Sequence, residues 1–300
     1  MAISKTARAK SLWVLGICAA VGATGIYGWL VLKNTVKNVD DTPATAKTSL
    51  TQSVTPKAVE PVIAPPSPLP AKPIFDQTTL QTTIDGWNTG TPGTKAVAVM
   101  SIDGKMLASL SPQQPFFAAS LYKFYTAYFG YAEVDAGRVS SSEDYNNGRT
   151  RSECLDVMVS ESDSPCAEQM VNEIGKAEIN NRLKQIGINN TSMGDITTTA
   201  EDAALMMARI ARGEGLTPAS QATFLQSAKN QIFRDALNAG FSDSVIVYDK
   251  VGFNELVEYH DVALVELADG RKFIVAVLTE NAGTRSIAEL ARQLEKIVQQ

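Results

Sequence analysis

The chain of 300 residues contains a single histidine, His260, and only three cysteines. A metal site built from several histidines is therefore excluded, and a Ser-His-Asp or Cys-His enzyme would have to use His260. We expect any nucleophilic mechanism here to use a base other than imidazole. Basic residues are not in excess either, because 27 Lys and Arg stand against 32 Asp and Glu. Without a basic stripe, nucleic acid is not an expected partner.

Charged residues are also missing from residues 11–32, SLWVLGICAAVGATGIYGWLVL, a run long enough to cross the hydrocarbon core of a membrane. Trp13 and Trp29 lie near its ends, where interfacial aromatic residues are common. The run predicts a transmembrane anchor. Because basic residues are denser before it than after it, residues 1–10 are expected to be cytoplasmic and the rest extracytoplasmic. A cleaved signal peptide is the alternative, although the run is longer than its usual apolar region.

Aromatic residues are absent from residues 33–73, which are rich in Thr, Ala and Pro. Such a segment cannot bury enough apolar surface to order itself, and its prolines favour extended conformations. We therefore expect a disordered stalk that holds a folded domain, residues 74–300, away from the membrane.

Two groups of apolar runs near the ends of this domain predict strands, and the first pair flanks Asp103-Gly104, a strong hairpin turn signal. Residues 118–240 have helical spacing or loop composition instead. The expected fold class is α+β, with a five-stranded antiparallel sheet made from both ends of the domain, flanking helices and an all-helical middle subdomain. The expected strands are 94–102, 105–111, 244–252, 257–267 and 272–280, and the expected terminal helices are 76–88 and 284–299.

Two of the cysteines, Cys154 and Cys166, fall within the predicted domain. On an oxidising side of a membrane they could pair and close a small loop. That loop, however, includes a segment that looks helical. A disulfide and two free buried thiols both remain open.

Ser120 and Lys123 lie in the stretch FFAASLYKFYTAYF, residues 116–129, which we interpret as a helix. Side chains three apart face the same way, so the amine of Lys123 can reach the hydroxyl of Ser120. The surrounding aromatic residues would lower the pKa of Lys123 by desolvation and make its neutral form available as a base. One S-x-x-K is expected by chance in a chain of this composition, so the motif needs support from elsewhere.

Two further elements supply that support: SDS at residues 162–164, where a helical pattern starts, and KVG at residues 250–252, where a strand ends. The order and placement of the three elements resemble S-x-x-K, S-D-N and K-T-G of the active-site serine enzymes that recognise penicillin. The resemblance covers nearly all of residues 74–300 and is greatest to the class A β-lactamase branch. It implies a β-lactamase/transpeptidase-like fold.

The resemblance also implies catalytic roles. Ser120 would be the acylated nucleophile and Lys123 its general base, while Ser162 would relay a proton to the leaving nitrogen. Lys250 would supply positive charge on the opposite wall of the cleft. The backbone N–H groups of Ser120 and Phe253 would form the oxyanion hole. No metal or other cofactor is implied.

Several positions in the implied substrate site depart from the family pattern. Ser164 stands where the family has Asn. The resemblance implies that Ser164, Gly252 and Phe253 bind the substrate. Val251 replaces a Thr or Ser, and Tyr259 lies where class A enzymes often have an arginine. Both of these changes remove groups that bind a substrate carboxylate.

The segment between Ile186 and Thr197 is too short for the class A omega loop and has no glutamate to activate a deacylating water. Glu201 is the nearest glutamate, but it and Asp163 are interpreted as residues at helix starts. Acylation is therefore expected to be possible and deacylation slow.

The sequence as a whole predicts a membrane-anchored extracytoplasmic serine hydrolase whose Ser120 reacts with a β-lactam or a peptidoglycan-type peptide. One alternative is a penicillin-binding-protein-like D-alanyl-D-alanine peptidase or transpeptidase. Another is a catalytically silent module that binds the cell wall, although the retention of both lysines and both serines of the motifs argues against it.

Overall fold

The computed structural model of the protein describes residues 75–254 and 257–299. The predicted anchor over residues 11–32 and the predicted stalk over residues 33–73 lie outside the described residues. Among the described helices, none has the length and apolar character that a membrane crossing requires.

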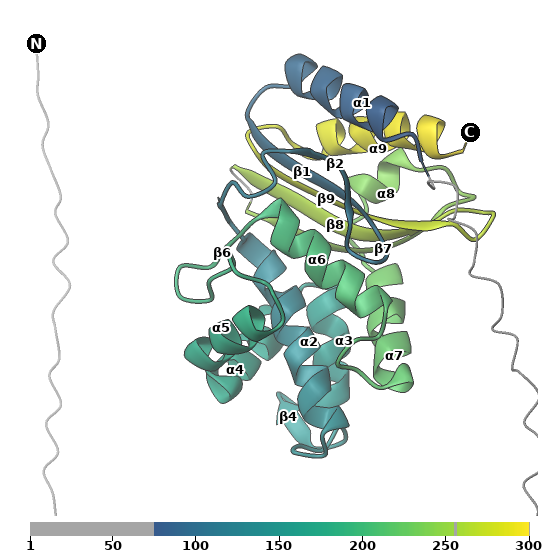
Figure 1. Cartoon of the computed structure of the whole chain (residues 1–300). Coiled ribbons are helices and arrows are strands. Elements are labelled where there is room, and N and C mark those ends of the chain that lie inside the picture. The colour runs from purple at the N-terminus through teal and green to yellow at the C-terminus, as the bar shows by residue number, and fades with distance from the viewer. Residues whose placement is uncertain (1–74, 255–256, 300) are drawn as a thin grey trace, which may run out of the picture. The chain divides into compact units, whose positions relative to one another are not determined.

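The centre of the described domain is an antiparallel sheet with the strand order β2-β1-β9-β8-β7 (Figure 1). The N-terminal hairpin joins the C-terminal strands through β1 and β9, where Val97 lies opposite Val277. The predicted sheet from both ends of the domain is therefore confirmed, and β7 lies at one edge. The strands are β1 (Thr94–Ser101), β2 (Met106–Leu110), β7 (Ile246–Phe253), β8 (Glu258–Glu266) and β9 (Lys272–Glu280).

Helices cover both faces of this sheet (Figure 1). Because side chains alternate along a strand, Val97 and Val275 pack against one layer, while Met100 and Ile274 pack against the other. Each such aliphatic side chain contributes about 1.5–3 kcal/mol when fully buried. The first layer consists of α1 (Gln77–Gly90), α8 (Leu237–Gly240) and α9 (Thr284–Val298). The second begins with α6 (Ala200–Ala211), which packs on β1 and β9.

The remaining helices form the middle of the domain, beyond α6. These helices are α2 (Tyr122–Asp135), α3 (Arg151–Ser160), α4 (Ser164–Ile174), α5 (Lys176–Gln185) and α7 (Pro218–Lys229).

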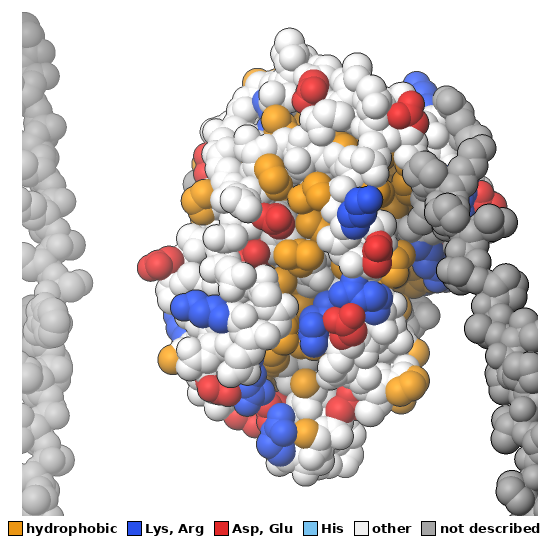
Figure 2. All heavy atoms as spheres, viewed as in Figure 1, with side chains coloured by type: hydrophobic (Ala, Val, Ile, Leu, Met, Phe, Trp, Pro, Cys, Tyr) orange, Lys and Arg blue, Asp and Glu red, His pale blue; other side chains and the backbone are white. Residues whose placement is uncertain are grey.

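Acidic and basic side chains are interspersed on the face of the molecule shown in Figure 2, without a basic stripe there.

The expectation that the middle is entirely helical is wrong at two places, where short two-stranded ladders form. One of them, β3 (Phe116–Phe117), pairs with β6 (Thr197–Thr198), and so the predicted helix over 116–129 begins only at Tyr122. Ala119 has a φ of 44°, which is incompatible with a helix continuing through it. The other ladder joins β4 (Asp144–Asn146) to β5 (Arg149–Thr150).

Cys154 on α3 and Cys166 on α4 form a disulfide, which decides between the two alternatives left open by the sequence. Both cysteines are fully buried. A cross-link that closes a loop of this length stabilises a fold by roughly 3 kcal/mol in the chain-entropy account. It also fixes the ends of the turn that carries Ser162 between the two helices.

Candidate active site

Ser120 lies in a 3-10 turn, Ala119–Leu121, that leads directly into α2. The backbone before this turn is anchored to the residue before β6, since Ala118 N–H donates to Ile196 O at 2.7 Å. A hydrogen bond from Leu121 N–H to Ala118 O, at 2.9 Å, then closes the turn. Half-buried Ser120 is thus presented on a turn that neighbouring elements constrain.

His260 supports the same turn and has no place in the catalytic set. Its Nδ1 accepts from the N–H of Thr279, so Nε2 carries the proton and donates to Phe117 O at 2.8 Å. Burial lowers the pKa of His260 to about 4, which keeps the ring neutral. The imidazole ties β8 to the strand before Ser120, in agreement with a base of another kind.

Lys123, in the first turn of α2, is only 2% exposed. Its Nζ donates to the backbone oxygen of Ser162 and, at 2.9 Å, to Ser164 Oγ. Burial lowers the pKa of Lys123, while the carboxylates of Asp163 and Glu168 partly oppose that shift. No hydrogen bond joins Lys123 to Ser120 among the described residues, but both side chains line one cavity.

Ser162 accepts hydrogen bonds from both lysines of the predicted site. While its backbone oxygen accepts from Lys123, its Oγ accepts from Lys250 Nζ at 2.7 Å. Its φ of 60° is a left-handed conformation that costs a non-glycine residue on the order of 1–3 kcal/mol. The next residue, Asp163, caps α4 by accepting from Cys166 N–H at 2.9 Å, as the sequence indicated, and pairs with Arg149.

Lys250 lies fully buried on β7, and its Nζ also donates to Val251 O at 2.7 Å. Burial lowers the pKa of Lys250 to about 7, with a further decrease from the positive charge of Lys123. The carboxyl groups of Asp249 and Asp261 oppose this decrease. Lys250 therefore changes its charge near neutral pH.

Gly252 allows the edge strand β7 to touch the serine turn. A Cβ at this position would lie 2.8 Å from both Ala118 O and Leu121 N, closer than real Cβ atoms approach backbone. The absence of a side chain thus lets β7, which continues to Phe253, pack against the turn that carries Ser120. The structure places the two N–H groups expected to form an oxyanion hole on adjoining segments.

A cavity of about 460 Å³ opens at Ser120 and Lys123. Ser164 and Glu168, both on α4, line the same cavity. Glu168 is exposed, and its carboxylate makes no hydrogen bond or ion pair within the described ranges. The cavity is also lined by Tyr122, Val171, Asn172, Lys176, Met193 and Ile196.

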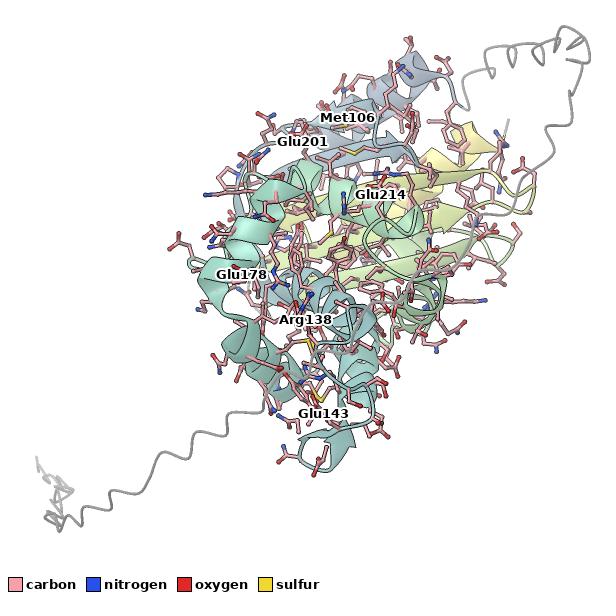
Figure 3. The ribbon with its side chains drawn as sticks, turned by 60° about the horizontal axis from the view of Figure 1, so that its bottom comes forward. Met106, Arg138, Glu143, Glu178, Glu201 and Glu214 are labelled. Carbon is pink, nitrogen blue, oxygen red and sulfur yellow. A yellow bond between two sulfur atoms is a disulfide. The ribbon has the colours of Figure 1, made fainter. Side chains whose placement is uncertain are left out.

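Glu168 was not anticipated from the sequence, although its spacing carried a signal. It follows Ser164 by four residues, so one helical face presents both side chains to the cavity. Glu201, the glutamate that the sequence offered as nearest, lies instead in the first turn of α6 (Figure 3), outside the lining of this cavity. Among residues 75–254 and 257–299, no group of His, Cys, Asp and Glu could hold a metal ion.

Comparison with known proteins identifies a family. The model of a family described as "Beta-lactamase enzyme family" matches residues 79–300. A search of the curated proteins found no match.

Three solved structures illustrate the likeness of fold. PBP-A shares 23% identity at a TM-score of 0.67, over 73% of this chain and 95% of that one. A PBP-A mutant described as an acyl-enzyme complex with penicillin G gives 23% and 0.68, over 73% and 96%. A class A β-lactamase from Bacteroides cellulosilyticus gives 19% and 0.65, over 74% and 96%.

A substitution at Gly252 tests the close contact between β7 and the turn that carries Ser120. In Gly252→Ala, the added methyl group would push β7 away from the serine turn, so we expect the unfolding free energy to fall by about 1–3 kcal/mol. Reaction of Ser120 with an acylating reagent should slow about 100-fold, because displacing a reacting group by 1 Å has effects of that size. Calorimetry and mass spectrometry measure the two quantities.

Gly86→Ala is the matched control, since nothing lies within 4 Å of a Cβ there and the position is helical. It should be neutral or slightly stabilising and leave the reactivity of Ser120 unchanged. Wild-type reactivity in Gly252→Ala would contradict the role given to this contact.

Proposed function

Because the chain belongs to the β-lactamase enzyme family, we propose that it is a serine hydrolase in which Ser120 is acylated by a β-lactam or a cell-wall peptide. The observation that carries this proposal is the pair of buried lysines that meet at Ser162. One of them shares a cavity with the proposed nucleophile. The PBP-A acyl-enzyme with penicillin G supports the choice of substrate class.

In the proposed acylation, neutral Lys123 takes the proton of Ser120, whose Oγ attacks the carbonyl carbon of the substrate. The N–H groups of Ser120 and Phe253 stabilise the negative charge that develops on the carbonyl oxygen. As the carbon–nitrogen bond breaks, Ser162 gives its proton to the leaving nitrogen. Lys250, which donates to Ser162 Oγ, replaces that proton. Ser164 accepts a hydrogen bond from Lys123 and so keeps its amine in place. From α4, the Ser164 side chain also contacts the substrate in this proposal.

The proposed release of the acyl group is slow. It requires a carboxylate that orients and deprotonates a water, and the described lining of the cavity contains one carboxylate, Glu168. Since Glu168 is exposed and has no described partner that orients it, its contribution as a base should be small. A long-lived acyl-enzyme fits a penicillin-binding-protein-like peptidase or transpeptidase, and this second candidate is favoured by the similarity to PBP-A.

The proposed location is the outer side of a membrane, with residues 11–32 as a single-pass anchor and residues 33–73 as a stalk. The charge-free run and the basic residues before it support the anchor. The disulfide between Cys154 and Cys166 supports an extracytoplasmic domain, because such bonds persist in oxidising compartments. Cell-wall peptides would be accessible there.

Covalent labelling tests the function. The full chain in detergent should form a fluorescent penicillin adduct that mass spectrometry assigns to Ser120. Lys123→Met should slow adduct formation about 1,000-fold, within the range expected for loss of a general base, while the unfolding temperature stays nearly unchanged. Ser120→Ala is the blank. If the wild-type chain forms no more adduct than this variant, with penicillin and with a D-alanyl-D-alanine thioester, the silent binding module is the better account.

The lifetime of the adduct tests the role of Glu168. Glu168→Gln should release the adduct about tenfold more slowly, because the exchange removes the base for water. Adduct formation should not slow, since losing this carboxylate favours the neutral form of Lys123. Glu201→Gln, which also removes a carboxylate but lies outside the cavity, should leave both rates unchanged. Equal adduct lifetimes in the two variants would show that water is activated by another group.

A further inference from the structure

A second pocket, of about 270 Å³, is lined in part by β7, the strand that carries Lys250. It begins at Val251 and Phe253, the two neighbours of Gly252, and none of its lining residues lines the cavity at Ser120. The pocket is also lined by Phe233, Asp235, Tyr259 and Thr284. The pocket therefore adjoins the proposed reaction centre without belonging to it.

The rings of Phe233, Phe253 and Tyr259 line this pocket. Phe253 and Tyr259 lie opposite each other on β7 and β8, and their rings are stacked at 6.3 Å between centroids. Phe233, from the segment before α8, meets Phe253 edge-on at 5.0 Å. The faces of aromatic rings carry negative electrostatic potential, which attracts cations within about 6 Å.

The charge of the pocket has the same sign. Asp235 is the charged residue in its described lining, and its carboxylate is exposed, with no hydrogen bond or ion pair in the described part of the chain. The adjacent Arg234 does not line the pocket. Its guanidinium donates instead to the carbonyl oxygens of Lys229 and Gln231 and to Asn238.

This lining would bind an anion weakly. Val251 and Tyr259, the two positions where a carboxylate-binding group was expected, supply no positive charge, and an entering carboxylate would meet Asp235. A cation on an apolar stem finds both an aromatic surface and a counter-charge. Val251 in the wall of the pocket directly follows Lys250 on β7, and Lys250 donates to Ser162, the residue proposed to protonate the leaving nitrogen.

We propose that this pocket is a substrate subsite for an ammonium group carried on an aliphatic stem, on the leaving-group side of the bond that Ser120 attacks. The subsite rests on the proposed function for its place in a reaction, but its binding preference does not. Where two substrates differ only in the charged group of the leaving portion, it gives the proposed enzyme a preference for the one that carries an ammonium group.

Binding to the Ser120→Ala chain in nonionic detergent tests the subsite without any reaction. Pentyltrimethylammonium and its matched anion, pentanesulfonate, are titrated at low salt and followed by saturation-transfer NMR. The cation should bind at least about fivefold more tightly than the anion, and Asp235→Asn should weaken cation binding about fivefold. Asp243→Asn, an exposed acidic residue outside the pocket, is the matched control and should bind as the parent does.

Equal binding of the two probes, or an unchanged cation affinity in Asp235→Asn, would overturn the subsite. A second measurement then places it in the reaction, using thioesters whose leaving groups end in an ammonium or a carboxylate. The wild-type chain should react about tenfold faster with the ammonium ester, and Tyr259→Arg should reduce or reverse that ratio. Failure of both esters to acylate Ser120 would count against the proposed function, whereas equal rates would count against the subsite alone.

Discussion

The structure of the site depends on the convergence of two buried lysines at one serine, Ser162. A charged amine removed from water costs several kcal/mol unless it is paired, and neither Lys123 nor Lys250 has a carboxylate among its hydrogen-bond partners in the described structure. Hydroxyl and carbonyl oxygens hold them instead. The lowered pKa values of both amines follow from this arrangement, because losing a proton relieves the cost of burial.

The fold provides the rigid supports that this arrangement needs. On one side, the disulfide and the cap formed by Asp163 fix the turn that carries Ser162 in a left-handed conformation. On the other side, Gly252 lets the edge of the sheet approach the turn of Ser120 closely. The proposed nucleophile and its base thus come from one segment, the proton relay Ser162 from a second and Lys250 from a third, each held by contacts outside the cavity. A hydroxyl and an amine positioned this way favour acylation, while the loosely held Glu168 favours slow release.

Much of this could be predicted from the sequence because its signals are local. Apolar runs and an Asp-Gly turn identified the strands of the sheet, and three short motifs identified the residues that line or support the site. The start of α2 could not be predicted in this way, since Phe116 and Phe117 look helical until they pair with residues 82 and 80 positions away. The same limit applies to Ser164, whose bond to Lys123 crosses 41 positions. Glu168 was overlooked although its helical spacing from Ser164 was visible.

The pH dependence of Ser120 acylation tests most directly whether a neutral Lys123 works beside a charged Lys250. Because acylation needs the deprotonated form of Lys123, whose pKa burial lowers, its rate should first rise with pH. Because it also needs the protonated form of Lys250, whose pKa burial lowers to about 7, the rate should pass through a maximum and decline at higher pH. Lys250→Met should react more slowly and lose that decline. A wild-type rate that keeps increasing up to pH 10, with the same profile in Lys250→Met, would contradict the account.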